Sequence, residues 1–172
     1  KNVTFRDSAG KAIQVKATPN GMTLFNSKNI GKPSYTIEYY VKDLNSDDYH
    51  MIDSAIQYAD AGALVTAKKK EFVGYSFDTA NVNNQLSGNV NSDNSLVLKV
   101  YYTRNTYNIS YELNGGQKTN ATLYPESYIY GETYTLDSPT RNGYDFYGWY
   151  ADEVYDTKIP SITEKTNGNL TL

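Results

Sequence analysis

One short aromatic signature occurs twice in this sequence, about seventy residues apart, and it limits the folds that the chain can adopt. The fuller copy spans residues 142–150, reads Asn-Gly-Tyr-Asp-Phe-Tyr-Gly-Trp-Tyr and holds the single tryptophan of the chain. A shorter copy, Val-Gly-Tyr-Ser-Phe, spans residues 73–77. Alternating aromatic residues after a glycine are typical of a half-buried strand. Two copies of one strand signature therefore predict two copies of one small β domain.

The shorter copy belongs to a first predicted domain, residues 35–106. Residues 35–41 alternate with period two, which predicts a strand with one buried face. Residues 60–70 predict either a helical turn or a short strand. Further strands are predicted at residues 50–56, 74–77 and 95–103.

The fuller copy belongs to a second predicted domain, residues 107–172, which repeats this plan. Its first five residues match residues 35–39, and Asn114-Gly115-Gly116 predicts a tight turn after the first strand. Residues 124–136 predict a strand pair with a turn at Tyr130-Gly131-Glu132. The sequence ends within its last predicted strand, so we expect this domain to be truncated there and the parent protein to continue. The very short link between the repeats predicts a stiff pair of domains.

Residues 1–34 differ in composition from the rest of the chain. They contain none of the eighteen tyrosines and carry six basic residues against one acidic residue. Short strands at Val3–Phe5, Ala12–Val15 and Met22–Phe25 are predicted, separated by turns at residues 7–10 and 19–21. We interpret this N-terminal β segment as the end of a preceding module, or as strands that pack onto the next domain. A basic patch for an acidic partner is the alternative.

Composition excludes several classes of function. The formal net charge of −3 gives no overall basic field for nucleic acid or for an anionic membrane. The chain has no cysteine, which excludes disulfides, thiolate metal sites and a cysteine nucleophile. No apolar run approaches the ~20 residues that a membrane-spanning helix needs. We therefore expect a chain without a membrane span and without nucleic acid as a partner.

Spaced motifs give the second domain a family resemblance. It resembles the Listeria–Bacteroides repeat, also called the internalin B-repeat, through Tyr107–Tyr111, Asn114–Gly116, Tyr130–Glu132, Pro139-Thr140, Gly143–Tyr150, Thr157-Lys158 and Asn169–Leu172. The first domain is similar to the mucin-binding-protein-like repeat that often precedes such modules. That similarity depends on Tyr35–Tyr40, Gly74–Phe77, Leu86–Gly88 and Leu96–Arg104, and lacks the Gly-Trp-Tyr element.

The resemblance implies a mainly β chain with little helix, in which each domain has a β-grasp-like (ubiquitin-like) fold. It also implies an extracellular, wall-associated bacterial protein in which such modules act in adhesion or as spacers. It supplies no catalytic residue, no cofactor and no metal ligand. We accordingly expect a monomeric, non-catalytic segment of a longer chain.

Three tyrosines are the candidate ligand contacts: Tyr40, Tyr102 and Tyr147. Neighbouring strand residues point to opposite faces, so one member of each Tyr-Tyr pair, Tyr39-Tyr40 and Tyr101-Tyr102, is expected to face outward. Trp149 is interpreted as a core residue, with a sugar-stacking platform as the alternative.

Other candidate sites are weaker. Asp43, Asn45 and Asp47 follow the opening of a calcium loop but lack its glycine and its final glutamate, so an Asn/Asp turn is the better interpretation. His50, the single histidine, has no evident partner for a zinc site or a catalytic triad. A Lys–Asn or Lys–Asp isopeptide crosslink stays open.

Two functions follow as hypotheses. The first is a stalk, spacer or adhesion module of a bacterial cell-surface protein. The second is a module that binds a host glycan or an extracellular protein through exposed tyrosines.

Overall fold

The computed structural model describes residues 5–6, 12–13, 15–18, 21–24 and 31–172. Within these ranges, regular structure consists of strands and one short 3-10 helix, η2 (Ala121–Leu123). The prediction of a mainly β chain with little helix is confirmed. The β-grasp detail stays a prediction.

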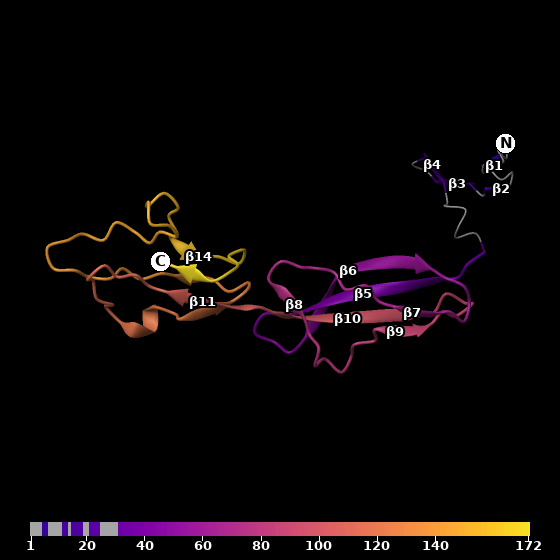
Figure 1. The fold of residues 1–172 in the computed structure, drawn as a ribbon, viewed down its shortest axis with the longest axis horizontal. Helices are drawn as coiled ribbons and strands as arrows, with labels where there is room; N and C mark the ends of the chain where they lie inside the picture. The colour runs from indigo at the N-terminus through magenta and orange to yellow at the C-terminus, as the bar shows by residue number, and fades with distance from the viewer. Residues whose placement is uncertain (1–4, 7–11, 14, 19–20, 25–30) are drawn as a thin grey trace. The chain divides into compact units, whose positions relative to one another are not determined.

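Residues 34–104 contain a four-stranded sheet in the order β6 (Tyr49–Tyr58), β5 (Ser34–Lys42), β10 (Val97–Arg104) and β8 (Tyr75–Phe77) (Figure 1). The period-two pattern of β5 is realised, because alternate residues of that strand are buried, namely Ile37, Tyr39 and Val41. Leu98 and Val100 are likewise fully buried on β10. Burial of these apolar side chains is the main stabilising contribution in this part of the chain.

A separate two-stranded sheet also lies within residues 35–106. Antiparallel β7 (Leu64–Thr66) and β9 (Ser87–Asn89) pair with each other, so the ambiguous segment 60–70 contains a short strand. The chain reaches β7 through a tight turn in which Gly62 adopts a φ of 80° and the amide of Ala63 donates to the carbonyl of Asp60.

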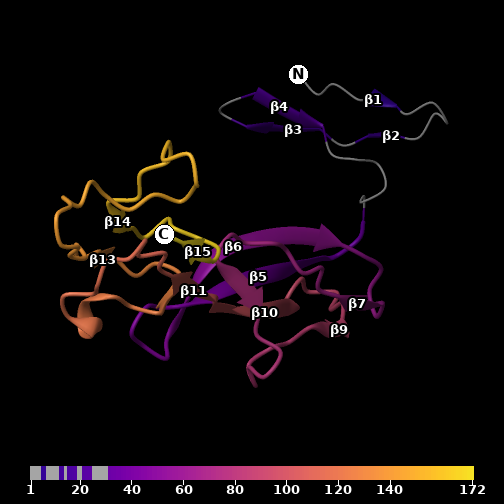
Figure 2. The same cartoon turned by 60° about the vertical axis from the view of Figure 1, so that its left-hand side comes forward.

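The second repeat has a three-stranded mixed sheet. Its central strand β11 (Thr106–Ser110) pairs antiparallel with β12 (Ser127–Ile129) and parallel with β15 (Leu170–Thr171). Figure 2 shows β11 and β15 alongside the short antiparallel pair β13 (Tyr134–Thr135) and β14 (Ser161–Ile162). The core of this repeat consists of Ile109, Tyr124, Tyr128, Leu136, Trp149, Ile162 and Leu172.

The predicted strand pair in residues 124–136 needs a correction. Both strands form, and the turn between them is present, with Gly131 at a φ of 98° and the amide of Glu132 bonded to the carbonyl of Ile129. However, β12 pairs with β11 and β13 pairs with β14, so the two strands do not form a hairpin with each other. The turn sends the chain from one sheet to another.

Both copies of the aromatic signature form the same type of turn. The prediction of a strand after this turn is wrong for the second copy. In both copies the glycine is the third residue of a four-residue turn, Phe72–Tyr75 and Arg141–Tyr144, closed by a hydrogen bond of 3.1 Å. Gly74 and Gly143 have φ values of 79° and 78°, which is the type II pattern that favours glycine. After the first turn, β8 pairs with β10. After the second turn, residues 145–149 form no strand, and Gly148 interrupts them with a φ of 142°.

Four short strands are described in the N-terminal segment. β1 (Phe5–Arg6) pairs antiparallel with β2 (Ala12–Ile13), and β3 (Val15–Thr18) pairs antiparallel with β4 (Gly21–Leu24). The predicted turn at residues 7–10, most of the turn at 19–21 and the side chains of the proposed basic patch lie outside the described residues.

The chain divides into two compact units. The first contains residues 1–39, 51–68 and 82–100, and the second contains residues 40–50, 69–81 and 101–172. Strands β5, β6 and β10 contribute residues to both units. The boundaries at residues 34 and 106 stay predictions.

Candidate functional site

A surface depression of about 810 Å³ lies in the second repeat, where the fuller copy of the signature forms much of its wall. Six aromatic side chains line it: Tyr144, Phe146, Tyr147, Trp149, Tyr150 and Tyr155. Four carboxylates and one guanidinium also line it: Glu112, Asp145, Asp152, Glu153 and Arg141. The depression therefore combines aromatic surface with an excess of negative charge.

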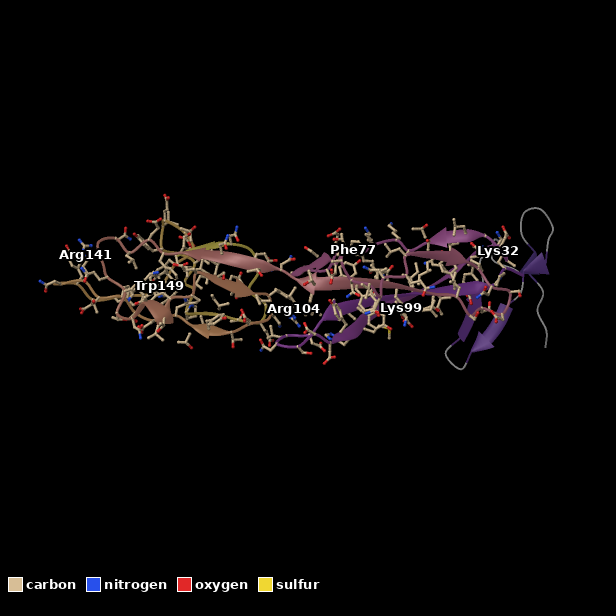
Figure 3. The ribbon with its side chains drawn as sticks, turned by 90° about the horizontal axis from the view of Figure 1, so that it is seen from below. Lys32, Phe77, Lys99, Arg104, Arg141 and Trp149 are labelled. Carbon is tan, nitrogen blue, oxygen red and sulfur yellow. The ribbon has the colours of Figure 1, made fainter. Side chains whose placement is uncertain are left out.

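The buried side chain of Trp149 fixes the segment of residues 142–150 to the core of the second repeat. This side chain is 5% exposed, its ring packs against Tyr111, Tyr124 and Phe146, and its indole N–H donates to the carbonyl of Asp137 at 2.9 Å. Figure 3 shows where Trp149 lies among the side chains of the second repeat. The interpretation of Trp149 as a core residue is confirmed. A buried indole whose N–H is satisfied fixes the backbone position from which the neighbouring rings project.

Burial around Trp149 also affects a neighbouring phenol. Desolvation, with a smaller contribution from Tyr124, raises the pKa of Tyr111 to about 12. The Tyr111 hydroxyl donates to the carbonyl of Pro125 at 2.9 Å, so its neutral form is the one that the folded structure holds.

One side of the depression is a loop organised by Asp152. The Asp152 carboxylate accepts hydrogen bonds from the amides of Val154, Asp156 and Thr157 at 3.1, 3.0 and 2.6 Å. These bonds, those from Asp156 and Thr157 foremost, hold the pKa of Asp152 below its usual value. The loop keeps Tyr155 at a φ of 57°, a conformation that few non-glycine residues adopt, with its ring edge-on to Tyr150. The bonds to Asp152 thus present Tyr155 at the surface.

Two cations of the chain already lie over rings of the depression. The guanidinium of Arg141 lies 4.0 Å from the ring centre of Tyr144, while it donates to the carbonyl of Asn114 at 2.7 Å. The Lys158 ammonium lies 5.4 Å from the ring centre of Tyr147 and donates to the carbonyl of the same residue at 2.9 Å. These are cation–π geometries.

A second polar arrangement, the junction, joins β10 to β11 within the second compact unit. We define the junction as Arg104, Asn105, Gly74, Tyr75 and Tyr130. Asn105 is the single residue between the two strands, and both of its backbone groups are bonded: its amide to the carbonyl of Gly74 and its carbonyl to the amide of Tyr130, each at 2.9 Å. No freely solvated linker residue separates these two strands.

Arg104 connects three segments of the chain at the junction. Its Nε donates to the carbonyl of Lys42 and its Nη1 to the carbonyl of Tyr130, both at 2.8 Å. Its guanidinium lies 5.2 Å from the ring centre of Tyr75, and burial outweighs that positive charge, so the pKa of Tyr75 is raised. The planar fork of arginine suits such donation in two directions.

Glycine is required where Tyr130 enters the junction. Gly74 is buried, and a Cβ at this position would lie 2.1 Å from the Tyr130 ring. The Tyr130 ring packs edge-on against Tyr75 at 5.4 Å. The first copy of the turn therefore provides the surface against which the Tyr130 ring packs.

The three predicted ligand tyrosines lie in different environments. Tyr147 is 84% exposed at the depression. Tyr40 is half-buried and stacks on Tyr101 at 4.9 Å. The expected exposure of Tyr102 is wrong: its ring is 2% exposed, packs against Phe72 and Phe77, and its hydroxyl accepts from the amide of Lys70. Whether any of the three contacts a ligand stays a prediction.

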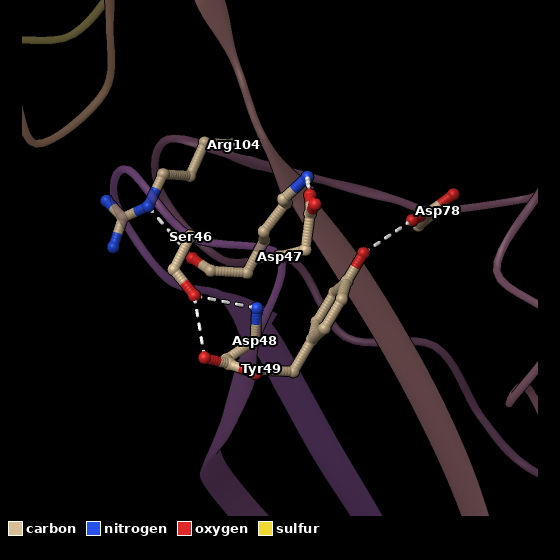
Figure 4. A network of polar contacts seen from close by, with 7 residues as sticks. Ser46, Asp47, Asp48, Tyr49, Asp78 and Arg104 are labelled. Atoms are coloured by element: carbon tan, nitrogen blue, oxygen red, sulfur yellow. Dashed lines mark hydrogen bonds and ion pairs between the residues drawn. The ribbon is translucent and has the colours of Figure 1, made fainter.

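The carboxylates of the turn at residues 43–47, which resembles the opening of a calcium loop, have partners within the chain. Asp47 is bonded to Lys42 at 2.8 Å, and this contact lowers the pKa of Asp47 and raises that of Lys42 (Figure 4). Asp43 contacts Nδ1 of His50, the single histidine, which the sequence favours as a structural residue at the edge of a strand. Asn45 has a φ of 61°, as its interpretation as a turn residue predicts.

The same close-up shows how this turn is tied to the chain around it. The hydroxyl of Tyr49 donates to Asp78 at 2.9 Å, and Ser46 bonds both the amide and the carboxylate of Asp48 (Figure 4). Within the described ranges, no group of three or more His, Cys, Asp or Glu residues is placed to hold a metal ion. Among the same residues, no helix is long and apolar enough to cross a membrane.

Sequence reasoning missed the residues that build the junction and the loop. Arg104 carried no signal, because its partners are carbonyls distant in sequence. Gly74 belongs to the aromatic signature, but its role depends on Tyr130, which is distant in sequence. Asp152 is not among the candidate sites of the sequence, although an aspartate before a short polar loop is a known cap for backbone amides.

Comparison with known families supports the second repeat. Residues 107–172 match the family model of the Listeria-Bacteroides repeat domain. This repeat family is typical of bacterial surface or extracellular proteins and is generally non-catalytic. No curated protein and no solved structure matches the chain.

Proposed function

We propose that this chain is a spacer segment in the stalk of a bacterial cell-surface protein, where stiffly joined β repeats hold an adhesive region away from the cell wall. The junction supports this function most directly. A spacer needs successive modules that do not bend freely where one meets the next, and at the predicted boundary between the repeats the bonded residue Asn105 stands in place of a flexible linker.

The mucin-binding-protein-like character of residues 35–106 belongs to the same proposal. It is supported by the shared turn, because Phe72–Tyr75 and Arg141–Tyr144 have the same hydrogen bond and the same positive φ at glycine. Two related repeats in tandem are what an extended surface protein would contain. The chain then acts as a monomer, within a longer protein exported to the cell surface.

Arg104→Lys tests the spacer function. Lysine keeps the charge but loses the fork that reaches two carbonyls, so the junction should loosen. We expect the 15N order parameters of Asn105 and Tyr130 to fall from the value of about 0.85 typical of rigid backbone toward the flexible range below about 0.6.

Arg141→Lys is the matched control, because Arg141 also donates to a carbonyl and lies over a tyrosine ring but takes no part in the junction. It should leave the order parameters of the junction unchanged. Low order parameters in the native chain, or equal effects of the two substitutions, would refute the stiff spacer.

A binding function is the second candidate, and the exposure of Tyr147 favours it. A largely exposed tyrosine beside a depression is available to a host glycan or an extracellular protein. Tyr40 offers part of its ring surface, whereas Tyr102 would require a local rearrangement to reach a ligand. A glycan array probed with the native chain and with Tyr147→Ala tests this function, and signals that are equal for the two proteins would exclude Tyr147 from it.

A further inference from the structure

We infer that the depression of the second repeat binds a basic protein segment, with a lysine or arginine side chain of that segment lying over the free face of Tyr147. This inference refines the binding function proposed above, because it commits the same site to one chemical class of partner. Neither the fold nor the spacer function depends on it.

The first argument is the exposure of the rings. Tyr147, Tyr144 and Tyr155 are 84, 65 and 64% exposed, and all three line the same depression. Single exposed aromatic residues are ordinary, but a group of them around a concave surface marks an interaction site. The indole of Trp149 and the carboxylate of Asp152 hold the backbone behind them, so the rings are positioned in advance.

The second argument is that these rings already bind cations. Arg141 lies over Tyr144 and Lys158 lies over Tyr147, in geometries that show the rings accepting a guanidinium and an ammonium. An aromatic ring has two faces, and one cation covers only one of them. The exposed area of Tyr147 leaves surface for a second cation from outside the chain.

The third argument is charge complementarity. Four carboxylates line the depression, against the charges of Arg141 in its wall and Lys158 beside it. Asp152 is occupied by backbone amides. Within the part of the chain that the structure describes, no hydrogen bond or ion pair engages the side chains of Glu112, Asp145 or Glu153, and all three are exposed. These carboxylates favour a cationic partner over a neutral one.

The net charge of the second repeat as a whole is negative, like that of the depression. Residues 107–172 carry nine acidic and four basic residues. A basic segment would be attracted to this repeat before contact and oriented by the carboxylates at the depression. A volume of about 810 Å³ is within the usual range for a ligand site and accommodates the side chains of a short segment.

The test is a titration of the full 172-residue chain with capped tetralysine and, separately, with a tetramer of N-acetylglucosamine, followed by 15N–1H chemical shifts. We expect tetralysine to shift the amides of residues 144–155. Tyr147→Ala should weaken binding about threefold to tenfold, in line with the loss of one cation–π contact. Tyr58→Ala, at another exposed tyrosine, is the control and should not weaken it.

The carboxylates are tested by the double substitution Asp145→Asn with Glu153→Gln. Binding at low ionic strength should weaken about tenfold or more, and the difference from the native chain should shrink at high salt because the attraction is screened. Glu164→Gln, at an exposed glutamate outside the depression, is the matched control. All substituted side chains are exposed, so the native emission of Trp149 should be kept and will verify folding.

The outcomes separate the proposals. Tetralysine binding that depends on Tyr147 and on the two carboxylates supports the inference. Binding that is equal in all variants overturns it, because the peptide then attaches elsewhere. Binding of the sugar tetramer alone, at the same amides, overturns the basic partner and keeps the binding function. If neither ligand shifts any amide, the basic partner is overturned. The spacer function is then still tested separately by the Arg104→Lys experiment.

Discussion

The Gly74→Ala substitution tests whether the absence of a side chain at residue 74 makes room for the Tyr130 ring in the junction. The native φ of 79° is unfavourable for alanine by about 1–2 kcal/mol. In addition, the new Cβ would lie 2.1–2.4 Å from three atoms of the Tyr130 ring, which must move away from Tyr75. Overpacking of this kind costs about 1–3 kcal/mol. We therefore expect Gly74→Ala to lower the free energy of unfolding by about 2–5 kcal/mol.

Gly143→Ala is a closely matched control. Gly143 occupies the same position of the same type of turn, with a φ of 78°, but a Cβ there meets no atom within 4 Å. Its cost should be the backbone strain alone, about 1–2 kcal/mol. The effect of glycine on the unfolded chain is common to both variants and cancels in the comparison. The difference between them, about 1–3 kcal/mol, measures the contact with Tyr130.

Urea unfolding followed by Trp149 fluorescence and by far-ultraviolet circular dichroism measures both variants. Trp149 reports on the core of residues 107–172, so a shift of its transition in Gly74→Ala shows that a residue outside the matched repeat stabilises that repeat. Two probes are needed because unfolding of two units need not be a single transition. Two results would refute the claim that packing of Tyr130 against Gly74 stabilises residues 107–172: equal destabilisation by the two substitutions, or a Trp149 transition that Gly74→Ala does not shift.

Two further predictions concern pH and the loop of the depression. Because burial raises the pKa of Tyr111 to about 12 from its ordinary value of 10.0, its contribution to stability is fully present below about pH 10 and is lost as the pH rises toward 12; urea midpoints from pH 9 to 12 should therefore fall less steeply in Tyr111→Phe than in the native chain. Asp152→Ala removes the acceptor of three amide hydrogen bonds, so hydrogen exchange at Val154, Asp156 and Thr157 should accelerate while exchange in β11 stays as in the native chain. Unchanged exchange at those amides would show that the loop holds without its carboxylate.

Local patterns in the sequence were sufficient for the strands and turns that depend on few neighbours. Period two located β5 because one face of that strand is buried. The pair Asn114-Gly115 identified a turn because both residues need a positive φ, which they have at 48° and 83°. The family match to residues 107–172 agrees with the motifs that suggested it.

Features that depend on distant partners could not be predicted in this way. Alternation correctly places Tyr101 and Tyr102 on opposite faces of β10, but it does not say that both faces are covered. Tyr101 packs against Tyr40 and Tyr49, and Tyr102 packs against aromatic rings on the other side, so neither is exposed. The positions of these covering rings follow from the tertiary fold.

The strand predicted in the fuller copy of the signature is wrong because it too depends on a distant partner. A strand needs a neighbour that accepts and donates its backbone hydrogen bonds. β8 has that neighbour in β10. Residues 145–149 have instead scattered partners: the carbonyl of Trp149 accepts from Ile159, and the carbonyl of Tyr147 accepts from the Lys158 side chain. Aromatic alternation therefore predicted a strand where the backbone has irregular partners.

The comparison of the two glycines suggests how one repeated turn came to serve two purposes. At Gly74 the missing side chain makes room for Tyr130, and the turn is buried in the junction. At Gly143 nothing fills the same space, and the turn remains exposed at the depression beside Tyr144. An alanine scan of both turns should accordingly change stability most at the first turn and ligand binding most at the second. A ligand that depended on the first turn as strongly as on the second would contradict this division of roles.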